Sequence, residues 1–101
     1  MGQVYDHGIG VGQDSAKAAE WYKRAAEQSH TGAQFNIAMM YIAGKGVQQN
    51  FVNARKWFIV SGARGAEKAK KAAEYIRRYL TPEQVAESDR SAQEWLEKHS
   101  E

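Results

Sequence analysis

The chain has 101 residues, of which 43% are hydrophobic and 26% charged, with a formal net charge of +2. These values fit one ordinary globular domain and exclude intrinsic disorder, and the lack of a long apolar run excludes a membrane span. Cysteine is absent, which excludes disulfides, iron–sulfur clusters, thiolate zinc sites and a cysteine nucleophile. So small a positive surplus gives no reason to expect a nucleic-acid partner.

An internal repeat organises the sequence. A shift of 36 residues superimposes Gly8 on Gly44, Gly10 on Gly46 and Trp21 on Trp57 without a gap. A constant period of this size is typical of stacked helical units, each of which buries its apolar side against the next. We therefore take the predicted elements unit by unit.

The first unit begins with a short helix at residue 1, followed by a glycine loop and a second helix for which Asp14 is the predicted N-cap. The inward stripe of this second helix is Ala18, Trp21, Tyr22 and Ala25. The opening helix is a turn shorter than its later copy, so the chain either starts with a stub or is a fragment of a longer array.

This short start would leave apolar side chains of the first unit poorly covered, namely Val4 and part of the Trp21–Tyr22 side. Exposed apolar patches of a few hundred Å² usually mark interfaces. The sequence thus predicts a symmetric homodimer through the N-terminal end. The alternative is that further repeats cover this side in a longer protein.

The second unit repeats the pattern with clearer signals. Thr31 and Gln34 form a predicted capping box, Gly44 a left-handed helix stop and Asn50 the next N-cap. The inward positions of its two helices follow a helical spacing; they are Ala33, Ile37, Met40, Tyr41, Ala54, Trp57, Phe58 and Ser61.

Two further helices complete the expected six, with no strand. One spans about 66–80; the other spans about 82–98, with Thr81 as N-cap, Pro82 at the first position and Gln84 completing a capping box. Their predicted inward residues are Ala69, Ala73, Ile76, Leu80, Val85, Ala92, Trp95 and Leu96. The last helix departs from the repeat, as the terminal cap of a solenoid does.

The predicted fold is therefore all-α, a right-handed α-solenoid of antiparallel helix pairs with about 2.5 repeats and a C-terminal capping helix. The expected segments are 1–32, 33–68, a partial third repeat at 69–80, and the cap at 81–101.

These residues resemble the Sel-1-like repeat family, a subclass of the tetratricopeptide-type helical repeats. The pattern consists of an aromatic residue, Gly-x-Gly-Val, a small residue and a Trp–aromatic pair; it occurs at Tyr41, 44–47, Ala54 and 57–58, and earlier at Tyr5, 8–11, Ala18 and 21–22. Ser29 and Ser61 stand where the family more often has glycine and alanine. The resemblance implies a non-catalytic adaptor or scaffold, often bacterial; without cysteine, the chain does not resemble the family's cysteine-rich, penicillin-binding branch.

No pattern indicates catalysis, a metal or a cofactor. The glycine loops lack the preceding strand and the Gly-Lys-Ser/Thr of a phosphate loop, so they are interpreted as structural. His7, His30 and His99 do not have metal-ligand spacing, and nothing orients Asp6, His7 and a serine as a triad. We expect no enzyme activity.

The tryptophans and the charge distribution have plain structural interpretations. Trp21 and Trp57 recur in register and are predicted in the core, whereas Trp95 covers the last apolar face or lies partly at an interface. Residues 64–80 carry six Lys or Arg against two Glu, and residues 81–101 carry two against six. The two segments pair with each other or form solvated faces.

The predicted function is a non-catalytic protein–protein interaction module, which binds a peptide or helix in the groove lined by the first helices. The alternative is a structural piece of a longer array or a self-associating dimer. The expected groove residues are Gln3, Asp6, Phe35, Met39, Ile42, Lys71, Tyr75 and Arg78, although Phe35 and Ile42 suit gap-filling between repeats equally well. No signal peptide is visible, and the compartment stays open between the cytoplasm and export.

Overall fold

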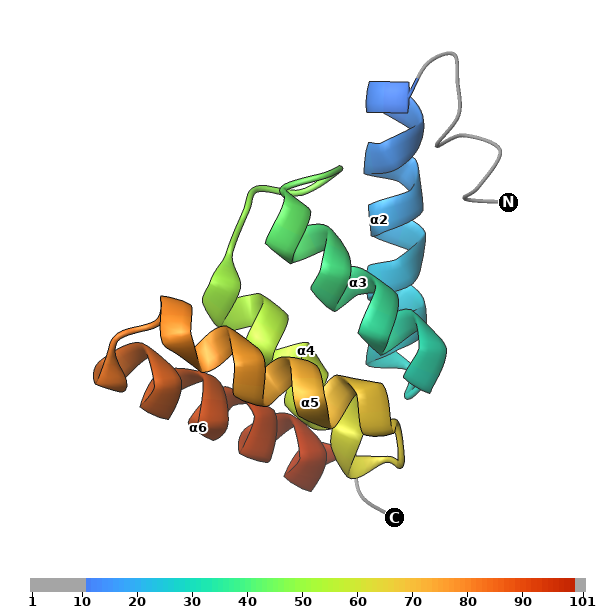
Figure 1. Ribbon diagram of the computed structural model, residues 1–101. Helices are drawn as coiled ribbons and strands as arrows, with labels where there is room; N and C mark the ends of the chain where they lie inside the picture. Colours follow the sequence, from blue (N-terminus) through green and yellow to red (C-terminus); the bar gives the residue numbers. More distant parts are fainter. Residues whose placement is uncertain (1–10, 100–101) are drawn as a thin grey trace.

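The computed structural model describes residues 11–99, with side chains from residue 15 onward (Figure 1). Its elements are α2 (Val11–Glu27), α3 (Thr31–Ala43), α4 (Phe51–Ala63), α5 (Glu67–Ile76), the 3₁₀ helix η1 (Arg77–Tyr79) and α6 (Pro82–Lys98). Residues 11–99 contain helices and no strand, which confirms the all-α prediction. The predicted opening helix and the first glycine loop lie outside the described residues.

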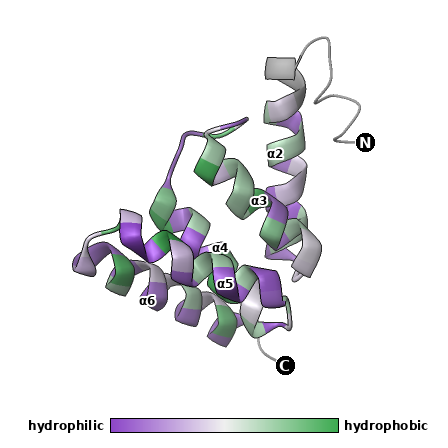
Figure 2. Cartoon of the chain, viewed as in Figure 1, coloured by the Kyte–Doolittle hydropathy of each residue, from purple (hydrophilic) through white to green (hydrophobic). Residues whose placement is uncertain are grey.

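Helix α4 is the centre of the molecule. It packs against α3, α5 and α6, whereas the strong packing of α2 is against α3 alone. Successive helices reverse direction through short connections, and α2 stands apart from the α4–α6 layer (Figure 1). Figure 2 shows green and purple residues alternating along α6, as expected of a helix with one buried face.

Three of the predicted helix ends are confirmed. Gly44 adopts a left-handed conformation with φ of 68°, and its N–H donates to the carbonyl of Met40. The Asn50 side chain accepts from the N–H of Asn53, so it caps α4. Thr81 and Gln84 form the reciprocal capping box at the start of α6, with Pro82 at the first helical position.

The capping box predicted for Thr31 and Gln34 is wrong. His30 is the N-cap of α3, because its backbone is extended and its Nδ1 accepts from the N–H of Ala33 at 3.1 Å. Thr31 is therefore already helical. Gln34 is fully buried, and its side-chain amide donates instead to the carbonyl of Ala26 at 3.1 Å, which ties α3 to the end of α2.

Two other predicted boundaries are corrected. Helix α2 starts at Val11 rather than after Asp14. In the second copy, the backbone N–H of Asn50 donates to Tyr41, which holds the corresponding segment outside the helix. Helix α5 ends at Ile76 and tightens into η1, after which Leu80 and Thr81 are extended. Extended backbone at Thr81 is the conformation that Pro82 favours in the residue before it.

The predicted core is confirmed around α4. Ile37, Ala54, Trp57, Phe58 and Ser61 are buried, and the predicted positions Ala69, Ala73, Ile76, Ala92 and Trp95 are buried with them. The rings of Trp57 and Trp95 meet edge to face with centroids 5.4 Å apart. Removing such large apolar surfaces from water is the main stabilising contribution in a domain of this size.

The prediction for α2 is wrong in its orientation. Trp21 is 60% exposed, and the fully buried positions are Ala19 and Ala26. The cause is the packing of the helices. Helix α3 covers one side of α2, and α6 covers Trp57 on α4, but α4 does not cover Trp21 on α2 in the same way. The partial exposure expected for the Trp21–Tyr22 side agrees with this arrangement.

In the second glycine loop, Gly46 is needed both for its backbone angles and because the loop passes close to α2. Gly46 has φ of 79°, and a Cβ there would lie 2.6 Å from the carbonyl carbon of Ser15 in α2. Any side chain at residue 46 would push the loop away from α2. The structural interpretation of this loop is thereby supported.

A buried arginine that the sequence analysis missed connects three helices. Arg55 is 5% exposed; its Nε donates to the carbonyl of Ala73 at 3.0 Å, and its Nη1 donates to Ser88 Oγ at 2.9 Å and Asp89 Oδ1 at 2.6 Å. A buried guanidinium needs such partners because an unpaired charge in the interior is costly. Arg55 thus fixes the capping helix α6 and α5 on α4.

Candidate protein-binding surface

The structure describes six of the eight predicted groove residues, and these fall into a half-buried and an exposed group. Gln3 and Asp6 lie outside the described residues. Phe35 and Ile42 are half-buried and pack against the core, with the Phe35 and Phe58 rings 5.6 Å apart. Of the two interpretations for Phe35 and Ile42, the structure favours gap-filling between helices.

The remaining groove residues are exposed. Met39 on α3 is 47% exposed and Tyr75 on α5 is 56% exposed, and Lys71 and Arg78 are exposed as well. The Arg78 guanidinium lies over the Tyr75 ring, 4.4 Å from its centroid. This cation–π contact follows from their spacing of three residues along the helix, and it holds both side chains at the surface.

Two aromatic residues that the sequence analysis missed extend this pair. The Tyr79 ring lies 5.9 Å from the Tyr75 ring and 5.8 Å from the Phe51 ring. The two tyrosine hydroxyls are 3.4 Å apart. We call Phe51, Tyr79, Tyr75 and Arg78 the aromatic row. The spacing of four residues between the tyrosines was the available signal, whereas the contribution of Phe51 from α4 depends on the tertiary structure.

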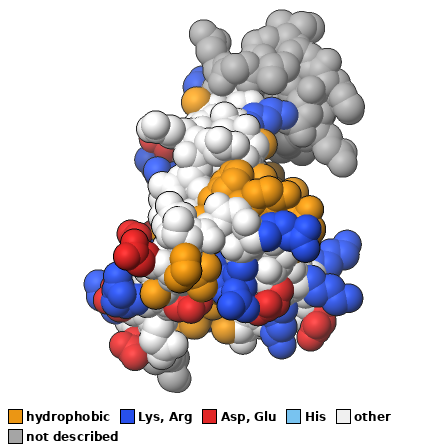
Figure 3. Space-filling model, turned by 60° about the vertical axis from the view of Figure 1, so that its left-hand side comes forward, with side chains coloured by type: hydrophobic (Ala, Val, Ile, Leu, Met, Phe, Trp, Pro, Cys, Tyr) orange, Lys and Arg blue, Asp and Glu red, His pale blue; other side chains and the backbone are white. Residues whose placement is uncertain are grey.

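The charge around the aromatic row is positive. Lys68, Lys71, Tyr75 and Tyr79 recur at helical spacing, and all four are exposed. Both acidic residues of α5 are already paired, Glu67 with Lys70 and Glu74 with Arg77. Within residues 15–99, no ion pair joins α5 to α6, so of the two interpretations of the charge pattern, solvated faces fit and mutual neutralisation does not. Figure 3 shows apolar patches bordered by Lys and Arg side chains on one face.

The neighbours of Tyr79 in the row change the pKa of its hydroxyl. The hydrogen bond with Tyr75 raises the pKa of the Tyr79 hydroxyl above its ordinary value, and electrostatic repulsion from Tyr75 adds to this, while Arg78 opposes it. The phenol of Tyr79 is therefore neutral at physiological pH. The row presents uncharged rings, with the guanidinium of Arg78 as its charge.

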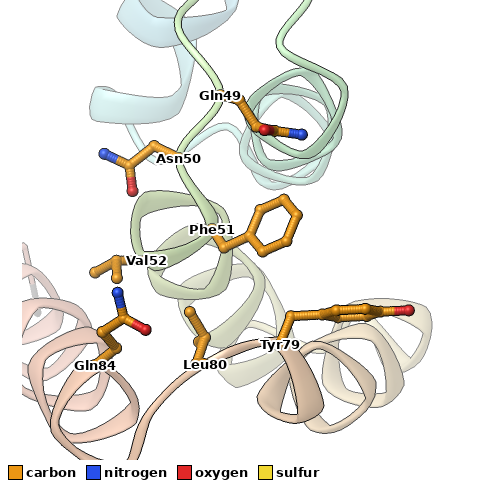
Figure 4. A pocket seen from close by; sticks show the side chains of 7 residues that line it. All are labelled: Gln49, Asn50, Phe51, Val52, Tyr79, Leu80 and Gln84. Carbon is orange, nitrogen blue, oxygen red and sulfur yellow. The ribbon is translucent and has the colours of Figure 1, made fainter.

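Surface pockets lie on either side of Leu80. One, of about 320 Å³, is lined by Gln49, Asn50, Phe51, Val52, Tyr79, Leu80 and Gln84 (Figure 4). In Figure 4 the Phe51 and Tyr79 rings point to the same side of it. The other, of about 530 Å³, is lined by Arg77, Arg78, Leu80, Pro82 and Val85. Both pockets combine apolar walls with a polar or charged edge. Such a lining suits the binding of an amphipathic peptide better than the catalysis of a reaction.

The ionisable groups do not converge in the described part of the chain. Between residues 15 and 99, no cluster of three or more His, Asp or Glu side chains is arranged to hold a metal ion. His30 caps α3, and His99 stacks on Trp95 with ring centroids 3.8 Å apart. None of the helices in residues 11–99 is long and apolar enough to cross a membrane.

The helix pairs, their period and their short glycine turns define a helical repeat protein. The family model for the Sel1 repeat matches residues 1–30 and 31–65, well over half of the chain. The chain therefore belongs to the Sel1 repeat family, which confirms the resemblance found in the sequence. No curated protein matches it.

Membership of the family gives the general role. Sel1 repeats are helical repeats that mediate protein–protein interaction rather than catalysis. The boundaries 1–32 and 33–68 expected from the sequence stay our prediction. The division of the remainder into a partial third repeat and a cap stays our prediction.

Proposed function

We propose that the protein is a non-catalytic interaction module that binds an acidic, amphipathic peptide or helix on the aromatic row and the basic side chains beside it. The observation that carries this proposal is the exposed contact between Tyr75 and Arg78, 4.4 Å from ring centroid to guanidinium. Tyrosine and arginine are enriched among the residues that dominate binding energy at protein interfaces. No catalytic residue, metal or cofactor enters the proposal.

The side chains of the aromatic row and of the pocket beside it indicate the kind of partner that would bind. Tyr75, Tyr79 and Phe51 offer apolar ring faces, and the pocket beyond Leu80 offers space for an apolar side chain. Arg77 and Arg78 lie at the edge of that pocket, and Lys71 is exposed about two turns earlier, on α5. A partner with apolar anchors and carboxylates on one face matches both features.

The row is already ordered before a partner binds. Its rings contact each other in sequence from α4 to α5, and the guanidinium of Arg78 is held on Tyr75. Side chains fixed in this way lose little conformational entropy on binding. The proposed site therefore needs no rearrangement of the helices.

The test is selection from a library of random peptides long enough to form a helix. Wild-type protein is expected to enrich acidic peptides with apolar residues at helical spacing, and their affinity falls as salt concentration rises. The double variant Tyr75→Ala/Arg78→Glu is expected to lose these peptides and to keep its helical circular dichroism. Arg90→Glu, a charge reversal at an exposed position of α6, is the matched control. Retention of the selected peptides by the double variant would contradict the proposal.

A further inference from the structure

The outer side of α2 forms a stripe of exposed side chains, which α6 contacts at its Glu27 end. Trp21 is 60% exposed, and Lys17, Glu20, Arg24 and Glu27 are all exposed. At about 100° per residue, these five positions fall within about 120° of each other around the helix. We call them the Trp21 stripe. Tryptophan is enriched at protein interfaces, where polar and charged residues form the rim around the apolar centre.

When two copies of the stripe lie antiparallel, each charged residue of one copy faces a residue of opposite charge in the other. Lys17 and Glu20 precede the tryptophan, and Arg24 and Glu27 follow it. Positions 17 and 27 share the midpoint 22, as do positions 20 and 24. In an antiparallel pair of α2 helices centred there, Lys17 faces Glu27 of the second copy and Glu20 faces Arg24, each pair occurring twice. A parallel pair in register would instead bring like charges together.

We propose that a second copy of this chain docks on the Trp21 stripe and forms a two-fold symmetric dimer through antiparallel α2 helices. A two-fold axis requires one surface to complement itself, which this order of charges does. The two Trp21 rings then lie beside the axis, one residue from the centre. This dimer is separate from the peptide-binding surface, which is on α5, η1 and the start of α4.

The rest of the chain is a poor alternative cover for Trp21. In the other unit, Trp57 is covered by Trp95 of α6, and the corresponding cover for Trp21 would be α4. The apolar side chains of α4 are already engaged by α3, α5 and α6. Its partly exposed positions include Asn53 and Lys56, which are polar.

The far end of the stripe is fixed in place. The indole N–H of Trp95 donates to Oε1 of Glu27 at 3.0 Å, so the carboxylate has a defined position at the end of α2. Its other oxygen is available to Lys17 of the second copy. Among the described side chains, no ion pair occupies Lys17, Glu20 or Arg24.

The contact is small, and the expected dimer is therefore weak. One pair of helices buries less than the roughly 800 Å² per partner of a standard stable interface. We expect a dissociation constant on the order of 100 μM. The ion pairs at its edges should weaken further as salt concentration rises.

Sedimentation equilibrium of the full chain, from about 5 μM to 1 mM, tests this proposal. The average mass of the wild-type protein is expected to rise from monomer towards dimer. Trp21→Ala and Glu20→Arg are each expected to raise the dissociation constant at least about tenfold, because they remove the central ring or place two positive charges opposite each other. The charge swap Glu20→Arg/Arg24→Glu restores opposite charges across the axis, and should bring the constant back to within about threefold of wild type.

Two matched controls separate this interface from general effects on the fold. Met39→Ala removes another exposed apolar side chain, and Arg90→Glu reverses another exposed charge; both should dimerise as wild type does. Helical circular dichroism verifies that every variant is folded. A monomer mass over the whole concentration range, or a charge swap as weak as Glu20→Arg alone, would overturn the proposal.

Discussion

The two units of the repeat place equivalent tryptophans in opposite environments. Trp21 and Trp57 are 36 residues apart in register, yet Trp21 is 60% exposed and Trp57 only 4%. The difference lies in their neighbours, because α4 is enclosed by α3, α5 and α6 whereas α2 packs strongly on α3 alone. The burial of a residue in a repeat therefore depends on the adjacent helices, and the repeat pattern alone does not determine that burial.

The same comparison holds at three other pairs of positions. Ala19 in α2 corresponds to Arg55 in α4, which holds the cap. Ser29 corresponds to Gly65, and both have positive φ, 73° and 109°. Met39 in α3 corresponds to Tyr75 in α5, where the aromatic row lies. Each pair shares a position in the repeat and differs in the residue that occupies it.

The largest expected difference is between the tryptophans. Trp57→Ala should lower the free energy of unfolding by about 3–5 kcal/mol, because it removes a large buried ring from the core. Trp21→Ala should cost about 1 kcal/mol or less in the monomer, because most of its ring is in water. Urea unfolding at low protein concentration measures both values. Equal midpoint shifts would contradict the difference in environment.

The next prediction concerns the arginine that only the second unit carries. Arg55→Ala should lower the free energy of unfolding by about 2–4 kcal/mol, because it leaves the carbonyl of Ala73 and the hydroxyl of Ser88 without their donor. Asp89→Ala should cost less than about 1 kcal/mol, because that side chain is 57% exposed. Thermal unfolding of the two variants compares them directly. If both cost the same, the ion pair rather than the buried hydrogen bonds would hold the cap.

Exchanging the residues at the two helix ends should give effects of opposite sign. Ser29→Gly should raise the free energy of unfolding by about 1 kcal/mol, because glycine adopts positive φ without steric cost. Gly65→Ser should lower it by a similar amount, although a Cβ there meets no atom within 4 Å. Urea midpoints measure both. A stabilising Gly65→Ser would show that backbone strain is not the determining factor.

The smallest effect is expected at Tyr75 and Tyr79, whose counterparts in α3 are Met39 and Ala43. Tyr75→Phe removes the hydroxyl that raises the pKa of Tyr79, so that pKa should fall towards its ordinary value of about 10. In the wild-type protein the raised pKa favours the folded state below pH 10, and this contribution is lost as pH rises through the pKa of the folded protein. Ultraviolet titration of the phenolate measures the shift. An unchanged Tyr79 titration would show that the two hydroxyls do not interact.

The sequence determined the local structure because its signals act within one or two turns. Gly44, Asn50 and Thr81 set helix ends through backbone angles and hydrogen bonds to residues nearby, and all three predictions are confirmed. His30 was missed because a histidine is an uncommon cap and Thr31 beside it fits the usual pattern better. The inward stripes of α4 and α5 followed from helical spacing alone.

Only the tertiary structure decided which faces meet. The packing of α6 on α4 buried Trp57 and gave Arg55 its partners, and the position of α2 left Trp21 exposed. For the binding surface, the sequence identified Tyr75 and Arg78, but Phe51 joined them from a separate helix. The period of a helix fixes which residues share a side, whereas the partner of that side depends on contacts between residues distant in the chain, which no local pattern records.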